Sequence, residues 1–234
     1  MTNKTNPYSI VMLGATGAVG SEVLKTLLNK KNINRLTLLG RTPISGINKD
    51  NVYQHKINVS KPNNYQEYIW GHEIAICTLG VGEPSKISKE EFLKIDKEAV
   101  LDFAKACKKA GVRHFELLAS VGISPKSRSF YLRAKGELVE ALIALKFNRL
   151  SIFQPSMILT PTNRYGIAQA IVLKVFPLIK PLLIGNMRKY RGVPVSILGQ
   201  SIAENIFLAG KDYEILHWDQ FYSIIDQSNK TKNH

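Results

Sequence analysis

The sequence predicts an α/β protein, a doubly wound parallel sheet with a small C-terminal cap. Two observations support this fold class. Short apolar runs alternate with amphipathic helical stretches between residues 8 and 153, and a glycine-rich turn joins the first run to the first helix. Such alternation is typical of parallel strands with helices on both faces of the sheet. Ligands of these sheets bind beyond the carboxyl ends of the strands.

The individual elements follow from periodicity. The predicted strands are the apolar runs Tyr8–Gly14, Arg35–Leu39, Val52–Ile57, Glu73–Leu79, Val112–Ala119 and Leu150–Phe153. The predicted helices are Val19–Asn29, an interrupted stretch Lys89–Ala110 that stops at Gly111, and Tyr131–Leu145.

After Pro155 the pattern loosens. Helices over about Arg164–Leu173 and Gly199–Ala209, with a short one near Asp219, would form a cap over the carboxyl edge of the sheet. We therefore expect one domain over residues 1–234. Its core would span about 8–158, its cap 159–227, and a disordered tail 228–234.

Composition excludes several classes of protein. The chain has 234 residues, 44% of them hydrophobic and 21% charged, as in ordinary soluble domains. Two cysteines without a C-x-x-C motif argue against a disulfide scaffold or a zinc ribbon, and the five histidines show no metal-ligand spacing. The first residues lack the apolar stretch of a signal peptide, so the expected location is cytoplasmic.

The formal net charge is +14, from 32 basic and 18 acidic residues. Such a surface attracts polyanions, including phosphorylated cofactors. The basic residues are scattered, so specific nucleic-acid binding is not expected. The apolar segment Ile167–Ile184 is interrupted by lysines and prolines and fails as a membrane span, which leaves membrane-surface contact as a minor alternative. Monomer and homodimer both stay open.

The glycine-rich turn has the spacing G-x-x-G-x-x-G, at Gly14, Gly17 and Gly20. Glycine permits a tight turn and close approach of the backbone to a phosphate, and a helix start offers unpaired N–H groups. A dinucleotide cofactor is therefore predicted here. The residues of this turn expected to contact it are Gly14, Thr16, Gly17, Ala18, Val19 and Gly20.

Arg41 indicates which dinucleotide is bound. It follows the second strand, 21 positions beyond Gly20, where a fold selecting NAD places an acidic residue. Because a guanidinium can bind a 2′-phosphate through two hydrogen bonds, NADP(H) is favoured over NAD(H). After the fourth strand, the loop Gly80–Gly82 is expected to run along the cofactor, with Leu79 and Gly80 in contact.

Tyr131 and Lys135 are spaced to share one face of a helix, and Ser120 closes the preceding strand. An ammonium near a phenol favours the phenolate and so helps proton transfer near neutral pH. Lys135 would also bind the ribose of a nicotinamide cofactor, while Ser120 would donate a hydrogen bond to a substrate carbonyl. These three residues form the predicted catalytic centre.

The three glycines, Ser120 and the Tyr131-x-x-x-Lys135 motif resemble the short-chain dehydrogenase/reductase superfamily, in its extended and atypical branches. The run from Phe115 to Tyr131-Leu-x-x-Lys135-Gly-Glu, followed by Phe153-Gln-Pro155, resembles the Tat-interacting-protein-like oxidoreductases over about residues 8–158. This resemblance implies a Rossmann fold, NADP(H) at the glycine loop and Arg41, a Ser–Tyr–Lys centre, and Pro155 and Ser156 near the nicotinamide. The sequence departs from the family pattern at two places. Asn58 stands where many relatives have Asp, and Gln154-Pro155-Ser156 stands where relatives often have Arg-Pro-Gly.

Two functions are consistent with these features. The first is an NADP(H)-dependent oxidoreductase acting on an unidentified carbonyl or alcohol substrate. The alternative is an NADPH-binding regulatory or assembly protein without turnover, a role that the resemblance also includes. A third class, a basic adaptor for nucleic acid or membrane, would need a clustered positive face that the sequence does not show.

Overall fold

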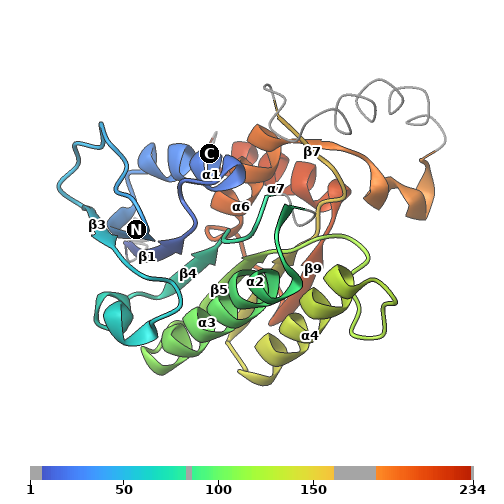
Figure 1. Ribbon diagram of the computed structural model, residues 1–234. Coiled ribbons are helices and arrows are strands. Elements are labelled where there is room, and N and C mark those ends of the chain that lie inside the picture. Colours follow the sequence, from blue (N-terminus) through green and yellow to red (C-terminus); the bar gives the residue numbers. More distant parts are fainter. Residues whose placement is uncertain (1–6, 83–85, 161–182, 233–234) are drawn as a thin grey trace.

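The computed structural model describes residues 7–82, 86–160 and 183–232. Its centre is a seven-stranded parallel sheet with the order β3-β2-β1-β4-β5-β6-β9 (Figure 1). The strands are β1 (Tyr8–Leu13), β2 (Ile33–Gly40), β3 (Val52–Lys56), β4 (Ile74–Cys77), β5 (His114–Leu118), β6 (Arg149–Phe153) and β9 (Tyr213–Leu216). The order reverses between β1 and β4, so the switch point that binds ligands in such sheets lies at their carboxyl ends.

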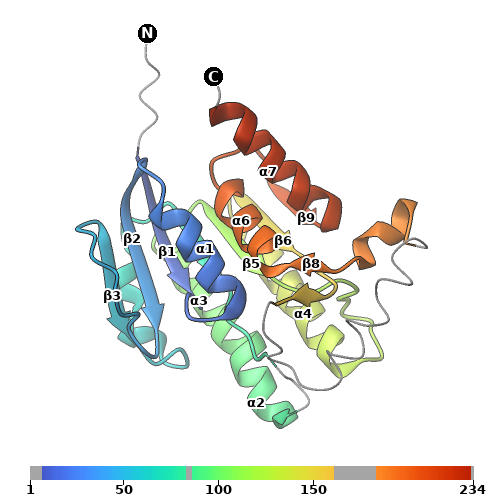
Figure 2. The same cartoon turned by 90° about the horizontal axis from the view of Figure 1, so that it is seen from above.

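Helices cover both faces of the sheet, and the predicted doubly wound fold is confirmed. Figures 1 and 2 show α1 (Ala18–Leu28), α6 (Val195–Asn205) and α7 (Trp218–Lys232) side by side on one face. The opposite face carries α2 (Lys89–Leu93), α3 (Val100–Lys109) and α4 (Phe130–Ala144). The π-helical segment η4 (Lys94–Ala99) joins α2 to α3. It corresponds to an interruption of the helical stretch that was predicted over Lys89–Ala110.

The sheet separates two hydrophobic clusters. In β1, Ile10 and Met12 pack toward α1, α6 and α7, whereas Val11 and Leu13 pack toward α3 and α4. All four side chains are at most 1% exposed. The period of two along a strand that is buried on both sides explains why β1 reads as a continuous apolar run.

The C-terminal third contributes to the sheet and its layers, rather than only to a cap. β9 pairs with β6 in parallel, and α6 packs directly on α1. A Cβ atom at Gly199 would lie 2.4 Å from Glu22 Cβ, so the glycine is what lets the two helices approach so closely. Near the carboxyl end of β6 lies a two-stranded ribbon of β7 (Ile158–Leu159) and β8 (Val193–Pro194).

The other elements expected in this third are partly outside the described residues. The predicted helix Arg164–Leu173 falls there, as does most of the apolar segment Ile167–Ile184. The helix expected at Gly199–Ala209 begins and ends about four residues earlier, as α6. Before α6, η6 (Gly185–Tyr190) is a 3₁₀ helix, as are η1 (Pro62–Asn64) and η2 (Gln66–Ile69) earlier in the chain.

The prediction of a disordered tail over residues 228–234 is wrong as far as Lys232, because α7 continues to that residue. Ser228, within the residues assigned to the tail, is buried, and its hydroxyl donates a hydrogen bond to Glu204 Oε2 at 2.7 Å. Within the described ranges, no helix is both long enough and apolar enough to cross a membrane.

Candidate functional site

The glycine loop between β1 and α1 is shaped by contact with its neighbours. Gly14 has a φ of +96°, and a Cβ atom there would lie 2.6 Å from the backbone of Leu79. At Gly20 a Cβ atom would lie 2.1 Å from Gly14 O. Thr78, which follows β4, donates from Oγ1 to Gly14 O at 3.0 Å. Two of the three glycines are therefore required by the packing of the loop itself.

The helix start at this loop is suited to an anion. Gly17 is the N-cap residue of α1, no side chain caps the helix, and its first turn contains no acidic residue. Thr16 and Gly17 are exposed, Ala18 is half-buried, and Val19 packs its side chain into the core. N–H groups and the positive end of the helix dipole thus face outward at the point where a pyrophosphate binds in dinucleotide folds.

Arg41 lies on the loop that follows β2. Its side chain is exposed and, in the part of the chain that the structure describes, makes no ion pair. The loop is held to β3 by two hydrogen bonds between the Gln54 side chain and the backbone of Ile44, at 2.8 and 3.0 Å. A cavity of about 590 Å³ opens between α1 and the loop residues 43–47, and Thr16 lies on its wall. The cavity thus lies between the first helix and the loop that carries Arg41, beside the glycine loop.

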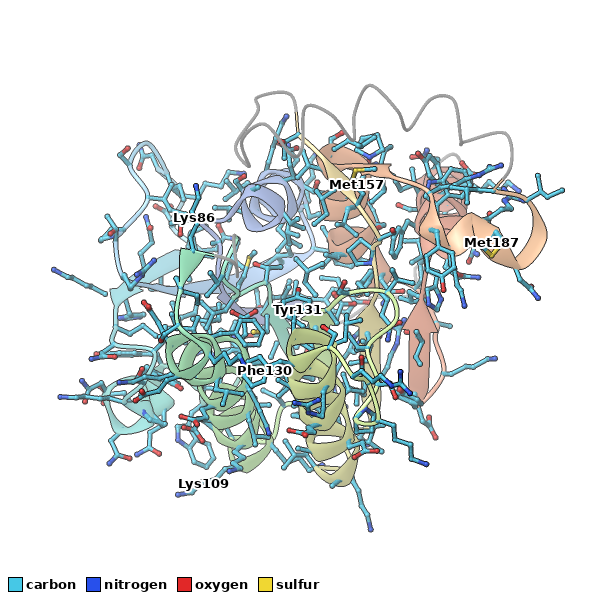
Figure 3. The ribbon with its side chains drawn as sticks, turned by 45° about the vertical axis from the view of Figure 1, so that its right-hand side comes forward. Lys86, Lys109, Phe130, Tyr131, Met157 and Met187 are labelled. Atoms are coloured by element: carbon cyan, nitrogen blue, oxygen red, sulfur yellow. The ribbon has the colours of Figure 1, made fainter. Side chains whose placement is uncertain are left out.

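Tyr131 and Lys135 both lie in the first turns of α4, and Figure 3 shows Tyr131 near the middle of the molecule. Lys135 Nζ lies 5.6 Å from the centroid of the Tyr131 ring. Phe92 of α2 also packs against the phenol, with the ring centroids 5.1 Å apart. The pairing predicted from the spacing is therefore present, and α2 holds the phenol in place.

Lys135 also has an acidic partner that the sequence analysis missed. Asp96 Oδ1 lies 2.9 Å from Lys135 Nζ, and both side chains are less than a tenth exposed. Burial lowers the pKa of Lys135, but the neighbouring Tyr131 and Asp96 outweigh this effect, and the pKa lies above its ordinary value. The lysine is thus a buried ammonium whose charge is balanced by a carboxylate.

A signal for Asp96 was present in the sequence. Phe92, Val100 and Phe103 form a buried stripe at helical spacing, and Asp96 interrupts this stripe as its one charged member. A carboxylate on an apolar stripe requires a buried partner, because an unpaired buried charge is costly.

Ser120 lies two residues beyond β5, between the ends of β5 and β6. Its neighbours bond across to β6: Ala119 N donates to Phe153 O at 2.8 Å, and Val121 N donates to Pro155 O at 2.9 Å. Ser120 is half-buried, and its hydroxyl makes no hydrogen bond within the part of the chain that the structure describes. The Ser120 hydroxyl is therefore available to hydrogen-bond a ligand.

The loop after Ser120 is fitted tightly to α4. Ser124 N donates to Leu132 O at 3.2 Å, and a Cβ atom at Gly136 would lie 2.3 Å from the backbone of Ser124. The glycine that follows Lys135 therefore sets how closely the Ser120 loop approaches the Tyr–Lys helix.

The predicted site residues lie at one edge of the sheet. The glycine loop follows β1, Leu79 and Gly80 follow β4, Ser120 follows β5, and Pro155 follows β6, so these residues meet at the carboxyl ends of adjacent strands. Asn58, at the corresponding end of β3, accepts a hydrogen bond from Ser60 N at 3.0 Å and forms a turn. Gln154 is buried, and its backbone N–H donates a hydrogen bond to Leu216 O.

Residues 14–154 match a family described as NAD(P)H-binding. The chain belongs to this NAD(P)H-binding family. The match begins at the first glycine of the loop and ends at the carboxyl end of β6, so it covers every predicted site residue except Pro155.

Two curated proteins are informative relatives. The chain is 34% identical to Protein HTATIP2 of Rattus norvegicus over 158 residues, which are 67% of this chain and 65% of the rat protein. It is also 34% identical to Protein FMP52, mitochondrial, of Meyerozyma guilliermondii over 181 residues, which are 73% of this chain and 74% of the yeast protein. The resemblance to Tat-interacting-protein-like proteins is thus confirmed.

Solved structures confirm the fold. A complex of MoeE5 with UDP-glucuronic acid and NAD superposes with a TM-score of 0.67 at 14% identity, covering 89% of this chain and 75% of that one. The oxidoreductase ylbE of Lactococcus lactis gives a TM-score of 0.64 at 18% identity, covering 93% and 97%. At these identities the similarity shows the fold alone.

The expected cytoplasmic location is overturned by the same relatives. The yeast proteins from Meyerozyma guilliermondii, Debaryomyces hansenii and Scheffersomyces stipitis are all mitochondrial by name. The lack of an apolar stretch at the start of the chain was the reason for the prediction, and it tests only for a secretory signal, because targeting peptides of mitochondria are amphipathic rather than apolar.

Proposed function

We propose that this protein is an NADP(H)-dependent oxidoreductase that interconverts a carbonyl group and an alcohol. The observation that supports this most directly is the buried, charged Lys135 beside Tyr131, on a helix that starts at the same sheet edge as the glycine loop. A phenol, an ammonium and a free serine hydroxyl at this edge are the groups that carbonyl reduction requires.

In the direction of reduction, Ser120 donates a hydrogen bond to the substrate carbonyl oxygen and polarises it. A dinucleotide held by the glycine loop, Arg41 and Lys135 would supply the hydride to the carbonyl carbon. Tyr131 gives its hydroxyl proton to the carbonyl oxygen, and solvent reprotonates the phenolate. Lys135 stabilises this phenolate and orients the ribose. In the oxidation of an alcohol, each proton moves in reverse.

The test of this function compares Tyr131→Phe with the native protein on a panel of aldehydes and ketones. We expect turnover, followed by NADPH absorbance, to fall by about 10²–10⁴-fold, because the general acid is gone. The dissociation constant for NADPH should change less than about threefold, since the phenol is not a binding group in this proposal.

The control is Tyr53→Phe. Tyr53 is 48% exposed and lies on β3, the edge strand four positions from β5 in the order of the sheet, away from the strands that α4 connects. It should turn over substrate at the native rate. Equal rates for Tyr131→Phe and the native protein would remove the catalytic role of the phenol.

One observation favours the alternative function, an NADPH-binding regulatory or assembly protein. The Lys135 charge is balanced by Asp96, so the ammonium and carboxylate together exert a weaker field on the phenol than a free ammonium would. A native protein that binds NADPH tightly but reduces no member of the panel would favour this second function.

Arg41 supports the proposed preference for NADP(H). It is exposed, free of ion pairs among the described residues, and mounted on a loop anchored to β3. We expect Arg41→Ala to raise the dissociation constant for NADPH by about 10–100-fold, because charge-assisted hydrogen bonds to the 2′-phosphate are lost. The dissociation constant for NADH, which lacks this phosphate, should stay within about twofold of the native value.

The matched control for Arg41→Ala is Lys109→Ala, which also removes one positive charge but at the far end of α3 (Figure 3). Fluorescence titration of both cofactors should show no selective loss in this variant. A parallel loss of NADPH and NADH affinity in Arg41→Ala would contradict the assignment.

A further inference from the structure

Asp96 occupies an unusual place in the fold. It lies in the π-helical segment η4 between α2 and α3, and its side chain is 2% exposed. Short π-helical segments within α-helices are often found at functional sites. This segment turns a carboxylate inward from a helix whose other inward side chains are apolar.

The two oxygens of this carboxylate bind two different parts of the site. Oδ1 accepts from Lys135 Nζ on α4 at 2.9 Å, and Oδ2 accepts from the backbone N–H of Val81 at 2.7 Å. A Cβ atom at Gly80 would lie 3.1 Å from Oδ1, so the loop after β4 is also in contact with Asp96. One side chain thereby connects the loop after β4 to the Tyr–Lys helix.

The surroundings of Lys135 contain few other charges. Tyr131 faces it from α4, Asp96 from η4 and Cys77 from β4. Lys97 and Glu137, the next charged residues on η4 and α4, form an ion pair with each other. Asp96 is therefore the carboxylate that balances the ammonium.

We propose that Asp96 is a positioning residue that fixes both the place and the charge of Lys135 and holds the Val81 backbone at the cofactor edge. The inference rests on the proposed function in one respect: Lys135 is taken to contact the cofactor ribose.

The chemistry of the two partners makes this role specific to a carboxylate. Lys135 Nζ and Val81 N are both donors, and each needs an acceptor. Asparagine has the same shape but only one acceptor oxygen, so its NH₂ group would face one of the two donors. The Asp96→Asn variant therefore breaks one contact and removes the charge without changing the volume.

The experiment measures NADPH affinity of the full chain by fluorescence at several pH values from neutral to strongly alkaline. We expect Asp96→Asn to raise the dissociation constant at least tenfold at neutral pH. We also expect its affinity to fall at a lower pH than that of the native protein, because a buried lysine without its carboxylate loses its proton more easily. A merely structural role would weaken binding equally at every pH.

Asp102→Asn is the matched control, because Asp102 lies on α3 in the same helical run and pairs with Lys105 at 3.8 Å near the surface. It should match the native protein within about twofold at each pH. If Asp96→Asn behaves like Asp102→Asn, the proposal is wrong.

A second variant covers the case in which Asp96→Asn is poorly folded. Removing the lysine as well, in Asp96→Asn/Lys135→Met, should raise the urea midpoint above that of the single variant, because the unpaired buried charge is gone. A double variant no more stable than Asp96→Asn would overturn the proposal. Neither readout uses turnover, so a native protein that binds NADPH without reducing any carbonyl would refute the proposed activity and leave the role of Asp96 standing.

Discussion

Gly17 and Gly20 stand in the same loop motif, but the structure gives them different amounts of space. A Cβ atom at Gly20 would lie 2.1 Å from Gly14 O and 2.7 Å from Thr78 Oγ1, whereas one at Gly17 would meet its nearest neighbour, Gly14 O, at 3.4 Å. Gly20 is therefore required by the fold. The packing around Gly17 tolerates a methyl group, so its requirement would come from a ligand.

This contrast predicts different defects for two alanine variants. We expect Gly20→Ala to lower the thermal unfolding midpoint by several degrees or more, because backbone must move to relieve the overlap. Gly17→Ala should lower it by no more than about 2–4 °C, since an N-cap alanine costs only about 1 kcal/mol or less relative to glycine. Its NADPH affinity should nevertheless fall. Calorimetry and cofactor titration would check both; equal midpoints for the two variants would contradict this account of the loop.

At the scale of elements, β5, β6, β9 and α6 share a buried polar cluster at the amino end of the sheet. Glu116 on β5 is fully buried; its Oε1 accepts from Asn205 Nδ2 at 2.7 Å, and its Oε2 has no partner among the described residues. His114 Nε2 and Ser151 Oγ lie 2.9 Å apart, and the Ser151 hydroxyl donates to Glu214. The cluster fixes the position of β9 beside β6, at a cost in desolvated charge.

This cluster predicts a pH-dependent stability. Burial raises the pKa of Glu116 to about 8, against the opposing effects of Asn205 and Arg149. The folded protein thus keeps a proton that the unfolded chain has lost above its ordinary pKa of 4.5, and the free energy of unfolding falls as pH rises toward 8. Burial lowers the pKa of His114 and His72 to about 3, so these groups destabilise the fold only below about pH 6.5.

Between pH 6.5 and 8, the effect of Glu116 on the free energy of unfolding is therefore separated from that of the two histidines. Across this interval we expect Glu116→Gln to gain on the order of 2 kcal/mol relative to the native protein in urea unfolding, because glutamine cannot ionise and can still accept from Asn205. Glu140→Gln, at an exposed position on α4, should show no such gain. Parallel pH profiles for Glu116→Gln and the native protein would show that Glu116 ionises normally.

At the scale of the molecule, sequence reasoning recovered the features that local periodicity determines. The glycine loop, the first six strands of the sheet and the start of α4 are where they were predicted, because apolar period and turn chemistry act over a few residues. β9 was missed, since Tyr213–Leu216 is a four-residue edge strand with Tyr213 and Ile215 partly exposed. A run so short is distinguished from a loop only by its partner.

The site shows the same division. Spacing along one helix was enough to pair Tyr131 with Lys135, but Asp96 comes from a different helix, 39 positions before Lys135. Likewise a short helix was expected near Asp219, but residues 228–232 were assigned to a tail because polar residues dominate there; they continue α7, which Phe221 and Ile224 anchor in the core. Contacts between distant segments were the part that one sequence could not supply.

The packing of α6 on α1, with α7 on α6, has a consequence for how the protein is made. A growing chain that has emerged as far as Pro155 already contains every motif residue, yet the part of α1 that packs on α6 is still uncovered and β6 still has an open edge. Among the described residues, both are covered by residues 193–232, which are synthesised after all the motif residues. The nucleotide-binding half of the sheet is thus completed only once this later segment has been made and has packed against it.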